Sequence, residues 1–439
     1  MLNKTQLKEY HRRRQNLMRA MGNNAIAIIP AANVKPRNRD VDYPYRQDSD
    51  FFYLTGFTEP ESVALLAPGR KGGEFILFCR QRDPQQETWH GRRLGVERAP
   101  ETLGADDAFP IDDIDEILPG MMEHGERIFY SMGLNPEFDA QVMHWVNQVR
   151  ANIRAGSHPP KEFISLDHIL HEMRLYKSRL ETGLMRKAGK ISAQAHMRAM
   201  QACKPGMTEY QLAAEFTYTF AKNNACEAYP SIVGGGANGC ILHYTENSDA
   251  LQDGDLVLID AGAEYQGYAA DITRTFPVNG RFSSIQREVY EIVLEAQAKA
   301  IDKVKPGNSW DDPHQAAIRV LTKGLVHLGL LKGNVNQLIK KNAYQPYYMH
   351  RTGHWLGMDV HDVGDYKLED DWRLLEKGMV TTVEPGLYFP AESGVPKHLA
   401  NIGIRIEDDV VVTRDGNEVL TDLAPKSVEE IEALMASTP

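Results

Sequence analysis

The sequence predicts an α+β protein of two domains, on three observations. The chain has 439 residues, which is too many for one ordinary hydrophobic core. Its first part mixes helical periodicity with short apolar runs, whereas the remainder repeats one order of helices and strands. The loop-like stretch AGSHPPKEF at 155–163 lies between the two parts. We therefore expect a smaller α/β domain at residues 1–173 and a larger domain at residues 174–439.

The N-terminal domain is expected to begin with an amphipathic helix over about 4–21, whose HRRR run at 11–14 would lie on the solvated face. Apolar runs then predict short strands. These are AIAII (25–29), a meander of FFYLTGF (51–57), SVALLAP (62–68) and EFILFC (74–79), and RIFYSMG (127–133). EFDAQVMHWVNQVRAN at 137–152 predicts a second long helix.

The larger domain contains an internal repeat. Each copy begins with a long helix, near residue 181 in the first copy and near residue 287 in the second, and each of these helices ends at K-P-G. A hydroxyl N-cap with a polar acceptor three residues later then starts a second helix. The residues at these positions are Lys204, Thr208 and Gln211 in the first copy and Lys305, Ser309 and Asp312 in the second.

Each copy also ends in two strands that carry acids. GDLVLIDAG and KGMVTTVEPG both place one glycine six residues before a carboxylate and another two residues after it. A second strand with a further carboxylate follows in each copy. The four acids are Asp260 and Asp271 in the first copy and Glu384 and Glu407 in the second. Packed with pseudo-two-fold symmetry, the copies would bring these acids together, with the sheet inside and the helices outside.

Four converging carboxylates need compensation, because an unpaired buried acid is costly. Either some of them are protonated or cations are bound. Two divalent metal ions would balance four negative charges and would acidify a water between them. Oxygen-rich ligation with an imidazole suits Mn²⁺, Co²⁺ or Fe²⁺. We expect two divalent metal ions, with Mn²⁺ as the leading candidate.

The stretch HRTGHWLGMDVHDVG at 350–364 contains three histidines that could supply the imidazole. His350 and His354 have the spacing of a helical zinc site. Arg351, however, stands where that motif needs glutamate, and the two glycines disfavour a long helix. The stretch therefore does not form a complete metal site by itself.

Bulk properties exclude several classes of function. The net charge of −11 argues against a nucleic-acid partner. No run of about 18 apolar residues predicts a membrane helix, and the charged N-terminus lacks a signal peptide's apolar core, so we expect a cytoplasmic protein. VGGGANG at 233–239 matches a dinucleotide fingerprint but does not open a helix. The four cysteines form no C-x-x-C pair and are expected to be reduced thiols: Cys79, Cys203, Cys226 and Cys240.

The five-part pattern of Asp260, Asp271, His354, Glu384 and Glu407 resembles the dinuclear metallopeptidases of family M24, which have the pita-bread fold. The motifs similar to those of proline-specific members are ILHYTEN (241–247), DAGAEYQGYAADITRTFPVNGRF (260–282), GHWLGMDVHDVG, VEPGLY and GIRIEDDVVV. YPYRQDSDFFYLTGFTEPES at 43–62 resembles bacterial Xaa-Pro aminopeptidases, the aminopeptidase P group. The resemblance implies a pita-bread C-terminal domain after a smaller α/β domain.

The resemblance also implies a role for each of the five residues. Asp271 and Glu407 would bridge the two metal ions. Asp260 would bind one of these ions, and His354 with Glu384 would bind the other. A hydroxide between the metals would attack the first peptide bond, and Glu384 would carry its proton to the leaving nitrogen.

Further residues are implied to contact the substrate. His243 and His361, one in each copy of the repeat, would hold the substrate carbonyl and the developing oxyanion. His350, Arg405 and Tyr388 would line the subsite for proline. The substrates would be peptides with an X-Pro N-terminus. Resemblance to dimeric and tetrameric relatives also implies a homo-oligomer.

Two alternatives stay open. A prolidase would share the metal donors but would cleave only X-Pro dipeptides, so an X-Pro-Y peptide distinguishes the two activities. A non-catalytic binding protein of the same fold would typically lack metal donors, and all five are present here. Many relatives have glycine where this chain has Arg351, which puts the shape of the pocket in question. Asp40, Asp42 and Trp89 are additional candidates for substrate contacts from the N-terminal domain.

Overall fold

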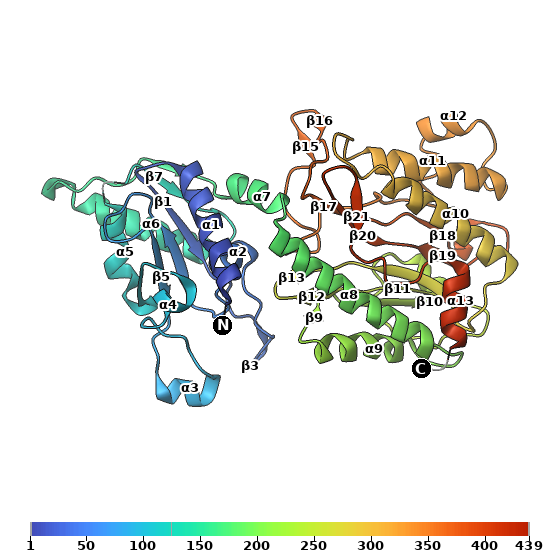
Figure 1. Cartoon of the computed structure of the whole chain (residues 1–439), viewed down its shortest axis with the longest axis horizontal. Helices are drawn as coiled ribbons and strands as arrows, with labels where there is room; N and C mark the ends of the chain where they lie inside the picture. The colour runs from blue at the N-terminus through green and yellow to red at the C-terminus, as the bar shows by residue number, and fades with distance from the viewer. Residues whose placement is uncertain (1, 124, 438–439) are drawn as a thin grey trace. The chain divides into compact units, whose positions relative to one another are not determined.

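A computed structural model of the chain describes residues 2–123 and 125–437. The chain divides into two compact units, Met1–Met173 and Arg174–Pro439 (Figure 1). Each unit has a hydrophobic core of its own. Both units mix helices and strands, as predicted for an α+β protein.

The first unit is built on one mixed sheet. Its strands are β1 Ala25–Pro30, β4 Val63–Leu66, β5 Phe75–Cys79, β6 Asp107–Pro110, β7 Arg127–Phe129 and β8 Glu162–Ile164, and β2 Pro36–Asn38 forms a separate hairpin with β3 Val41–Asp42. The spatial order is β6-β5-β4-β1-β7-β8. β1 pairs antiparallel with β4 and parallel with β7. The central strands are apolar throughout because both faces of the sheet are covered.

Helices complete the first unit. They are α1 Lys4–Met21, α2 Ser49–Thr55, α3 Pro84–His90, α4 Ala99–Leu103, α5 Ile114–Met122, α6 Pro136–Ala151 and α7 Asp167–Leu175, the last of which contains the boundary between the units. α5 and α6 bury Leu118, Trp145 and Val149 in one cluster with Ile26 and Ile28 of β1. The helical periodicity of 137–152 thus gives the amphipathic helix that the sequence predicts.

The prediction that the HRRR run lies in solvent is wrong for half of the run. His11 and Arg12 are exposed, but Arg13 and Arg14 are each only 2% exposed. Arg14 donates a hydrogen bond to the carbonyl of Leu54 at 2.8 Å, and Arg13 donates one to the carbonyl of Tyr53 at 3.0 Å. These carbonyls end helix α2, so the two guanidinium groups satisfy acceptors that a helix C-terminus leaves without partners.

The strand predicted for FFYLTGF is also wrong, because this segment forms α2. Its aromatic residues favour a strand, but the flanking residues favour a helix. The Asp48 side chain accepts the N–H of Phe51 as an N-cap, and Gly56 ends the helix in the left-handed conformation. The neighbouring predictions are confirmed, since SVALLAP and EFILFC contain β4 and β5.

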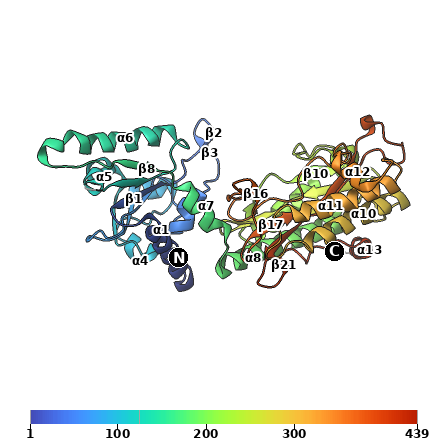
Figure 2. The same ribbon diagram turned by 90° about the horizontal axis from the view of Figure 1, so that it is seen from above.

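The second unit contains the two predicted helix pairs. They are α8 Arg179–Ala202 with α9 Glu209–Lys222, and α10 Ser284–Ile301 with α11 Asp312–His327; α12 Val335–Lys340 and α13 Val428–Ala436 are additional. α8 packs on α9, and α10 packs on α11, as both views show for the second pair (Figures 1 and 2). Thr208 caps α9 as predicted. Ser309 does bind Asp312 through its N–H, but the N-cap of α11 is Asp311.

The strands of the second unit repeat as well. The first half has β9 Cys226–Glu227, β10 Ile232–Gly235, β11 Leu256–Asp260, β12 Ala263–Tyr265, β13 Tyr268–Ala269 and β14 Thr273–Pro277. The second half has β15 Lys367–Leu368, β16 Asp371–Trp372, β17 Val380–Val383, β18 Gly386–Phe389, β19 Ile402–Arg405, β20 Asp408–Val412 and β21 Asn417–Val419. Each half has a three-stranded sheet, β10-β11-β14 and β17-β20-β21, in which the antiparallel pair β11–β14 matches the pair β17–β20. β19 of the β18–β19 pair contacts both β11 and β14.

Three features of the structure answer questions that the sequence raised. VGGGANG runs from β10 into a 3₁₀ turn, Gly236–Cys240, and not into the α-helix that a dinucleotide site needs. The stretch 350–364 contains no helix. Among the helices of residues 2–123 and 125–437, none is long and apolar enough to cross a membrane.

Candidate active site

The four acids of the repeat lie at matched strand ends. Asp260 is the last residue of β11, and Asp271 lies two residues before β14. Glu384 directly follows β17, and Glu407 directly precedes β20. Because β11 pairs antiparallel with β14, and β17 with β20, each pair of acids shares one end of one ladder.

Asp260 and Asp271 are joined by a tyrosine and flanked by an arginine. The Tyr229 hydroxyl lies 2.6 Å from Oδ1 of Asp260 and also hydrogen-bonds Oδ1 of Asp271. Arg405 donates from Nη2 to Oδ2 of Asp260 at 2.6 Å. Burial, together with the charge of Asp271, raises the pKa of Asp260 to about 6.

Glu384 and Glu407 are held by hydroxyl and backbone groups. Glu407 is 2% exposed and accepts a hydrogen bond from Oγ1 of Thr273 at 2.6 Å. The N–H of Glu384 donates to the carbonyl of Thr352 at 2.8 Å. Burial raises the pKa of Glu384 to about 7 and raises the pKa of Glu407 well above its usual value. A bound cation would reverse this preference for the neutral form.

His354 is positioned by a close approach of its own segment to β17. A Cβ on Gly353 would lie 2.1 Å from the carbonyl oxygen of Thr382, so this position requires glycine. Nδ1 of His354 lies 2.9 Å from the Trp355 carbonyl and therefore carries the proton, while Nε2 lies 3.5 Å from Oδ2 of Asp271. Burial alone would lower the pKa of His354, but the hydrogen bond with Asp271 raises it to about 9.

These side chains fit a divalent metal centre. Ligand atoms of Asp271, His354 and Glu407 all lie within 4.8 Å of one another. An imidazole whose Nδ1–H is fixed on a carbonyl presents Nε2 in the manner of metal-bound histidines. The raised pKa values of Asp260, Glu384 and Glu407 indicate a shortage of positive charge, which a metal would supply. Oxygen-rich donors with one imidazole suit Mn²⁺, Co²⁺, Fe²⁺ or Zn²⁺.

His350, Tyr388 and Arg405 form one hydrogen-bonded chain. Nε2 of His350 lies 2.9 Å from the Tyr388 hydroxyl, which also accepts from Nη1 of Arg405 at 3.1 Å. Tyr388 and Arg405 are buried, whereas the His350 side chain is partly exposed. Burial and the charge of Arg405 lower the pKa of His350 to about 3, so its imidazole is neutral. The chain ends at Asp260, to which Arg405 also donates.

His361 and His243 approach the same group from the two halves of the repeat. The ring of His361 packs edge-on against that of His354, with centroids 4.4 Å apart. Burial and the charge of His354 lower the pKa of His361. His243 is exposed, and its charge adds to the effects that lower the pKa of both His350 and His361.

Three residues of the site were not found by sequence reasoning. Tyr229 binds two of the acids, Thr273 binds a third, and the buried Asp409 accepts the N–H of Asp271 at 3.1 Å. Asp409 left a visible signal, since three consecutive acids open a buried strand in IEDDVVV. Tyr229 left none, because it stands in a loop far from the acids in sequence.

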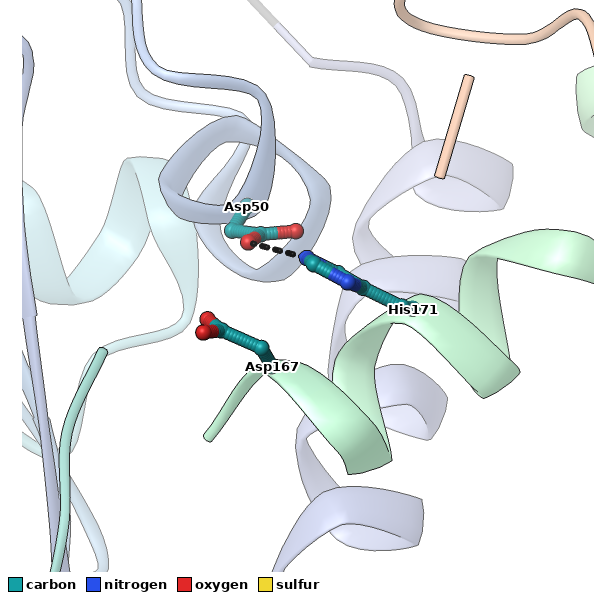
Figure 3. A group of neighbouring side chains, drawn as sticks. All are labelled: Asp50, Asp167 and His171. Carbon is teal, nitrogen blue, oxygen red and sulfur yellow. Dashed lines mark ion pairs between the residues drawn. The ribbon is translucent and has the colours of Figure 1, made fainter. Parts of the chain in front are cut away.

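A second group of carboxylates and histidine lies within the first unit (Figure 3). Ligand atoms of Asp50 in α2 and of Asp167 and His171 in α7 lie within 4.8 Å of one another. Nε2 of His171 is 3.7 Å from Oδ2 of Asp50, and the hydroxyls of Ser131 and Ser165 both donate to Asp167. The contact between Asp50 and His171 connects α2 with α7, so the group has a structural role.

The chain matches two protein families along its length. Residues 183–414 match metallopeptidase family M24, and residues 10–130 match the N-terminal domain of aminopeptidase P. The chain therefore belongs to metallopeptidase family M24. Its second unit has the pita-bread fold of that family, and its first unit is an N-terminal domain of the aminopeptidase P type.

Relatives and solved structures narrow this assignment. The chain is 48% identical to the Xaa-Pro aminopeptidase of Escherichia coli strain K12, over 98% of each chain. Its fold matches the Pseudomonas aeruginosa aminopeptidase PepP with a TM-score of 0.97 and 57% identity over 98% of each chain. The zinc-substituted E. coli aminopeptidase P in complex with product matches with a TM-score of 0.96 and 47% identity over 99% of each chain.

Proposed function

We propose that this chain is a metal-dependent aminopeptidase that releases the N-terminal residue from peptides with proline in the second position. The observation that carries this proposal is the convergence of the four acids at matched strand ends with His354, which lies in a loop. Similarity to Xaa-Pro aminopeptidases over almost the whole chain supports the same activity.

Asp271 and Glu407 are proposed to bridge two divalent cations, Asp260 to bind one cation, and His354 with Glu384 to bind the other. When bound, the cations would supply activation of the nucleophile and Lewis-acid polarisation of the scissile carbonyl. We propose Mn²⁺ as the native ion, because oxygen donors dominate the set. Tyr229, Arg405 and Thr273 orient the acids through the hydrogen bonds described above.

Glu384 is proposed to move the proton that the reaction needs. A carboxylate beside the nucleophile can accept its proton and pass it to the leaving group. One carboxylate oxygen faces Nε2 of His354 at 3.9 Å, and the other faces Nδ1 of His350 at 3.6 Å. Delivery of the proton to the proline nitrogen lets that nitrogen leave as an amine.

His361 and His243 are proposed to donate N–H groups to the substrate carbonyl and to the oxyanion that develops on it. The ring of His361 packs against that of His354, and the charge of His243 acts on His350 and on His361. An X-Pro bond has no amide N–H. Recognition through the carbonyl, with His350 lining the proline subsite in front of Tyr388 and Arg405, does not depend on the missing donor.

Location and assembly are proposed on indirect grounds. A cytoplasmic location suits the four cysteines, which are free thiols in the described residues. A homo-oligomer, dimer or tetramer, is proposed from the resemblance stated above.

The test compares three substrates with the full-length protein and Mn²⁺: an X-Pro-Y tripeptide, an X-Pro dipeptide and an X-Ala-Y tripeptide. We expect release of X from the X-Pro-Y peptide and little from X-Ala-Y. Cleavage of the dipeptide alone would identify a prolidase instead. Cleavage of none of them, with metal bound, would favour a binding protein.

A further inference from the structure

A buried ion cluster lies behind the loop that carries His361. Asp362 is 5% exposed and accepts a hydrogen bond from Nη2 of Arg174 at 2.6 Å and another from Nζ of Lys177 at 2.9 Å. Arg174 also binds Oδ2 of Asp359 at 2.6 Å. Arg174 lies at the end of α7, and Lys177 lies in the segment that leads into α8. The cluster thus joins this loop to a segment about 180 residues away in sequence.

The same carboxylate closes the loop on itself. We call residues 354–362 the His361 loop. The N–H of Asp362 donates to the Trp355 carbonyl at 2.9 Å, and Oδ1 of Asp362 faces the N–H of Asp359 at 3.4 Å. A Cβ on Gly357 would lie 2.1 Å from Oδ2 of Asp362, so the loop backbone packs directly against this carboxylate. Asp362, the last residue of the loop, therefore contacts both its beginning and its middle.

Both ends of the His361 loop carry side chains of the site. His354 begins the loop, and His361 immediately precedes Asp362, so the backbone of His361 cannot move without moving the anchored residue. The two imidazoles pack edge to face at 77°. A hydrogen-bond donor for an oxyanion must be held to a fraction of an ångström, because misplacement by about 1 Å costs about 10²-fold in rate.

We infer that Asp362 is a positioning residue for catalysis: clamped by Arg174 and Lys177, it fixes the His361 loop so that His361 reaches the substrate carbonyl. This inference rests on the proposed function of His361. Nothing in the reaction requires Asp362 to touch substrate or metal, and its side chain faces Arg174 and Lys177 instead.

The charges of Asp362, Arg174 and Lys177 stabilise the observed position of the loop. Burial opposes ionisation, but Lys177 and Arg174 hold the pKa of Asp362 below its usual range, so the carboxylate stays charged at neutral pH. Charge-assisted hydrogen bonds are shorter and stronger than neutral ones. A buried charge that loses its partners cannot be solvated, so alternative positions of the loop are costly.

The test is a double-mutant cycle in the full-length, Mn²⁺-loaded protein with an X-Pro-Y substrate. Asp362→Asn alone should lower kcat by roughly 10- to 100-fold with little change in KM or in bound metal. In a His361→Ala background, the same change should cost less than about threefold, because its effect runs through His361. An equal loss in both backgrounds would overturn the inference.

Two variants keep the test usable if Asp362→Asn folds poorly. Lys177→Met keeps the Asp362–Arg174 pair and should give a smaller loss of kcat that is likewise absent in the His361→Ala background. Ser427→Ala removes the N-cap of α13, outside the loop, and should lower stability while leaving kcat unchanged. A loss of kcat in Ser427→Ala equal to that in Lys177→Met would show that destabilisation alone explains the effect.

The outcomes also separate this inference from the proposed function. If the wild-type protein fails to cleave X-Pro-Y, or if His361→Ala has wild-type kcat, the proposed activity or the proposed role of His361 fails. If the wild-type protein is active and His361→Ala is impaired while Asp362→Asn has wild-type kcat, only the positioning role of Asp362 fails.

Discussion

Two loops reach the candidate active site from the two halves of the repeat, and a buried carboxylate holds each of them by different chemistry. The His361 loop is held by Asp362, which faces two cations. The loop at residues 235–249, here the His243 loop, is held by Glu209, whose hydrogen-bond donors are neutral groups. Those donors are the N–H groups of Gly235 and Asp249, the Asn238 amide and the Tyr244 hydroxyl, at 2.8 to 3.0 Å.

The difference teaches how one requirement, a fixed histidine, can be met in two ways. Glu209 is fully buried as the first residue of α9, where the helix dipole favours a negative charge. Dipoles and neutral donors can therefore solvate it without a counter-ion. Asp362 lies in a loop, outside any helix, and is paired with Arg174 and Lys177. The loss of one member of this group therefore leaves buried charge behind. The two loops should respond differently to the same amide substitution.

The largest expected effect separates the two ends of the His361 loop. His354→Ala removes a metal donor, so bound metal should be lost and turnover should fall by about 10³-fold. His361→Ala leaves all five donors in place, so metal content should match wild type while turnover falls by about 10²-fold. Metal analysis and kcat of both purified variants check this. Equal metal loss in the two variants would contradict the separate roles.

The next effect is on stability, at the charged clamp. Asp362→Asn should lower the free energy of unfolding by about 3 kcal/mol, because Arg174 and Lys177 lose a buried counter-ion. Urea unfolding at neutral pH measures the change. Adding Lys177→Met to Asp362→Asn should recover part of the loss by removing the surplus cation. A further decrease in the double variant would show that charge balance is not what Asp362 supplies.

A buried histidine next to the His361 loop should make the stability of the protein sensitive to acid. Nδ1 of His314 lies 2.8 Å from Oγ1 of Thr352, just before the loop, and burial lowers the pKa of His314 from 6.5 to about 4. The unfolded chain binds this proton first as pH falls, so stability is full above about pH 6.5 and declines toward pH 4. Between about pH 7 and about pH 4.5, the free energy of unfolding of His314→Gln should therefore fall by about 2 kcal/mol less than that of wild type. Urea titrations at the two pH values measure this difference. Parallel losses in both proteins would contradict the assignment.

The neutral anchor should be the more tolerant one. Glu209→Gln keeps one acceptor oxygen and strands no cation, so we expect a loss of about 1 to 2 kcal/mol in unfolding free energy. Its effect on kcat should disappear when His243 is already alanine. A loss of stability as large as that of Asp362→Asn would remove the distinction between the two loops.

The smallest effect is expected at the exposed ion pair between Asp359 and Arg174. The Asp359 side chain is 37% exposed and pairs with Arg174, whereas that of Asp362 is 1% exposed. Asp359→Asn should therefore cost less than about 1 kcal/mol and leave kcat near wild type. It is a chemically matched control for Asp362→Asn, three residues away. Equal effects of the two substitutions would show that burial does not decide the strength of the clamp.

Regular patterns in the sequence predicted most of the fold. Helical periodicity located α1, α6 and the two helix pairs of the repeat, and the glycine-strand-acid pattern located β11 and β17. Predictions failed where a local feature competed with composition. The capping residues Asp48 and Gly56 overrode the strand preference of FFYLTGF, and acceptors at the end of α2 drew Arg13 and Arg14 into the core.

The candidate site was predictable where residues recur at matched positions in the two copies. The four acids are such residues, and their matched strand ends bring them together. Tyr229, Glu209 and Arg174 were not predictable, because each reaches its partner only through tertiary folding and stands in no repeated pattern. The placement of substrate-contacting roles on His243, His350 and His361 came from family resemblance and remains a proposal.

The most direct test of the central proposal is a metal titration of the chelator-stripped protein, read out as cleavage of an X-Pro-Y tripeptide. We expect no cleavage without metal and full cleavage after about two Mn²⁺ ions per chain have bound. The His354→Ala variant should not regain activity under the same conditions. Full cleavage by the stripped protein, or full activity of His354→Ala, would contradict a dinuclear metallopeptidase mechanism.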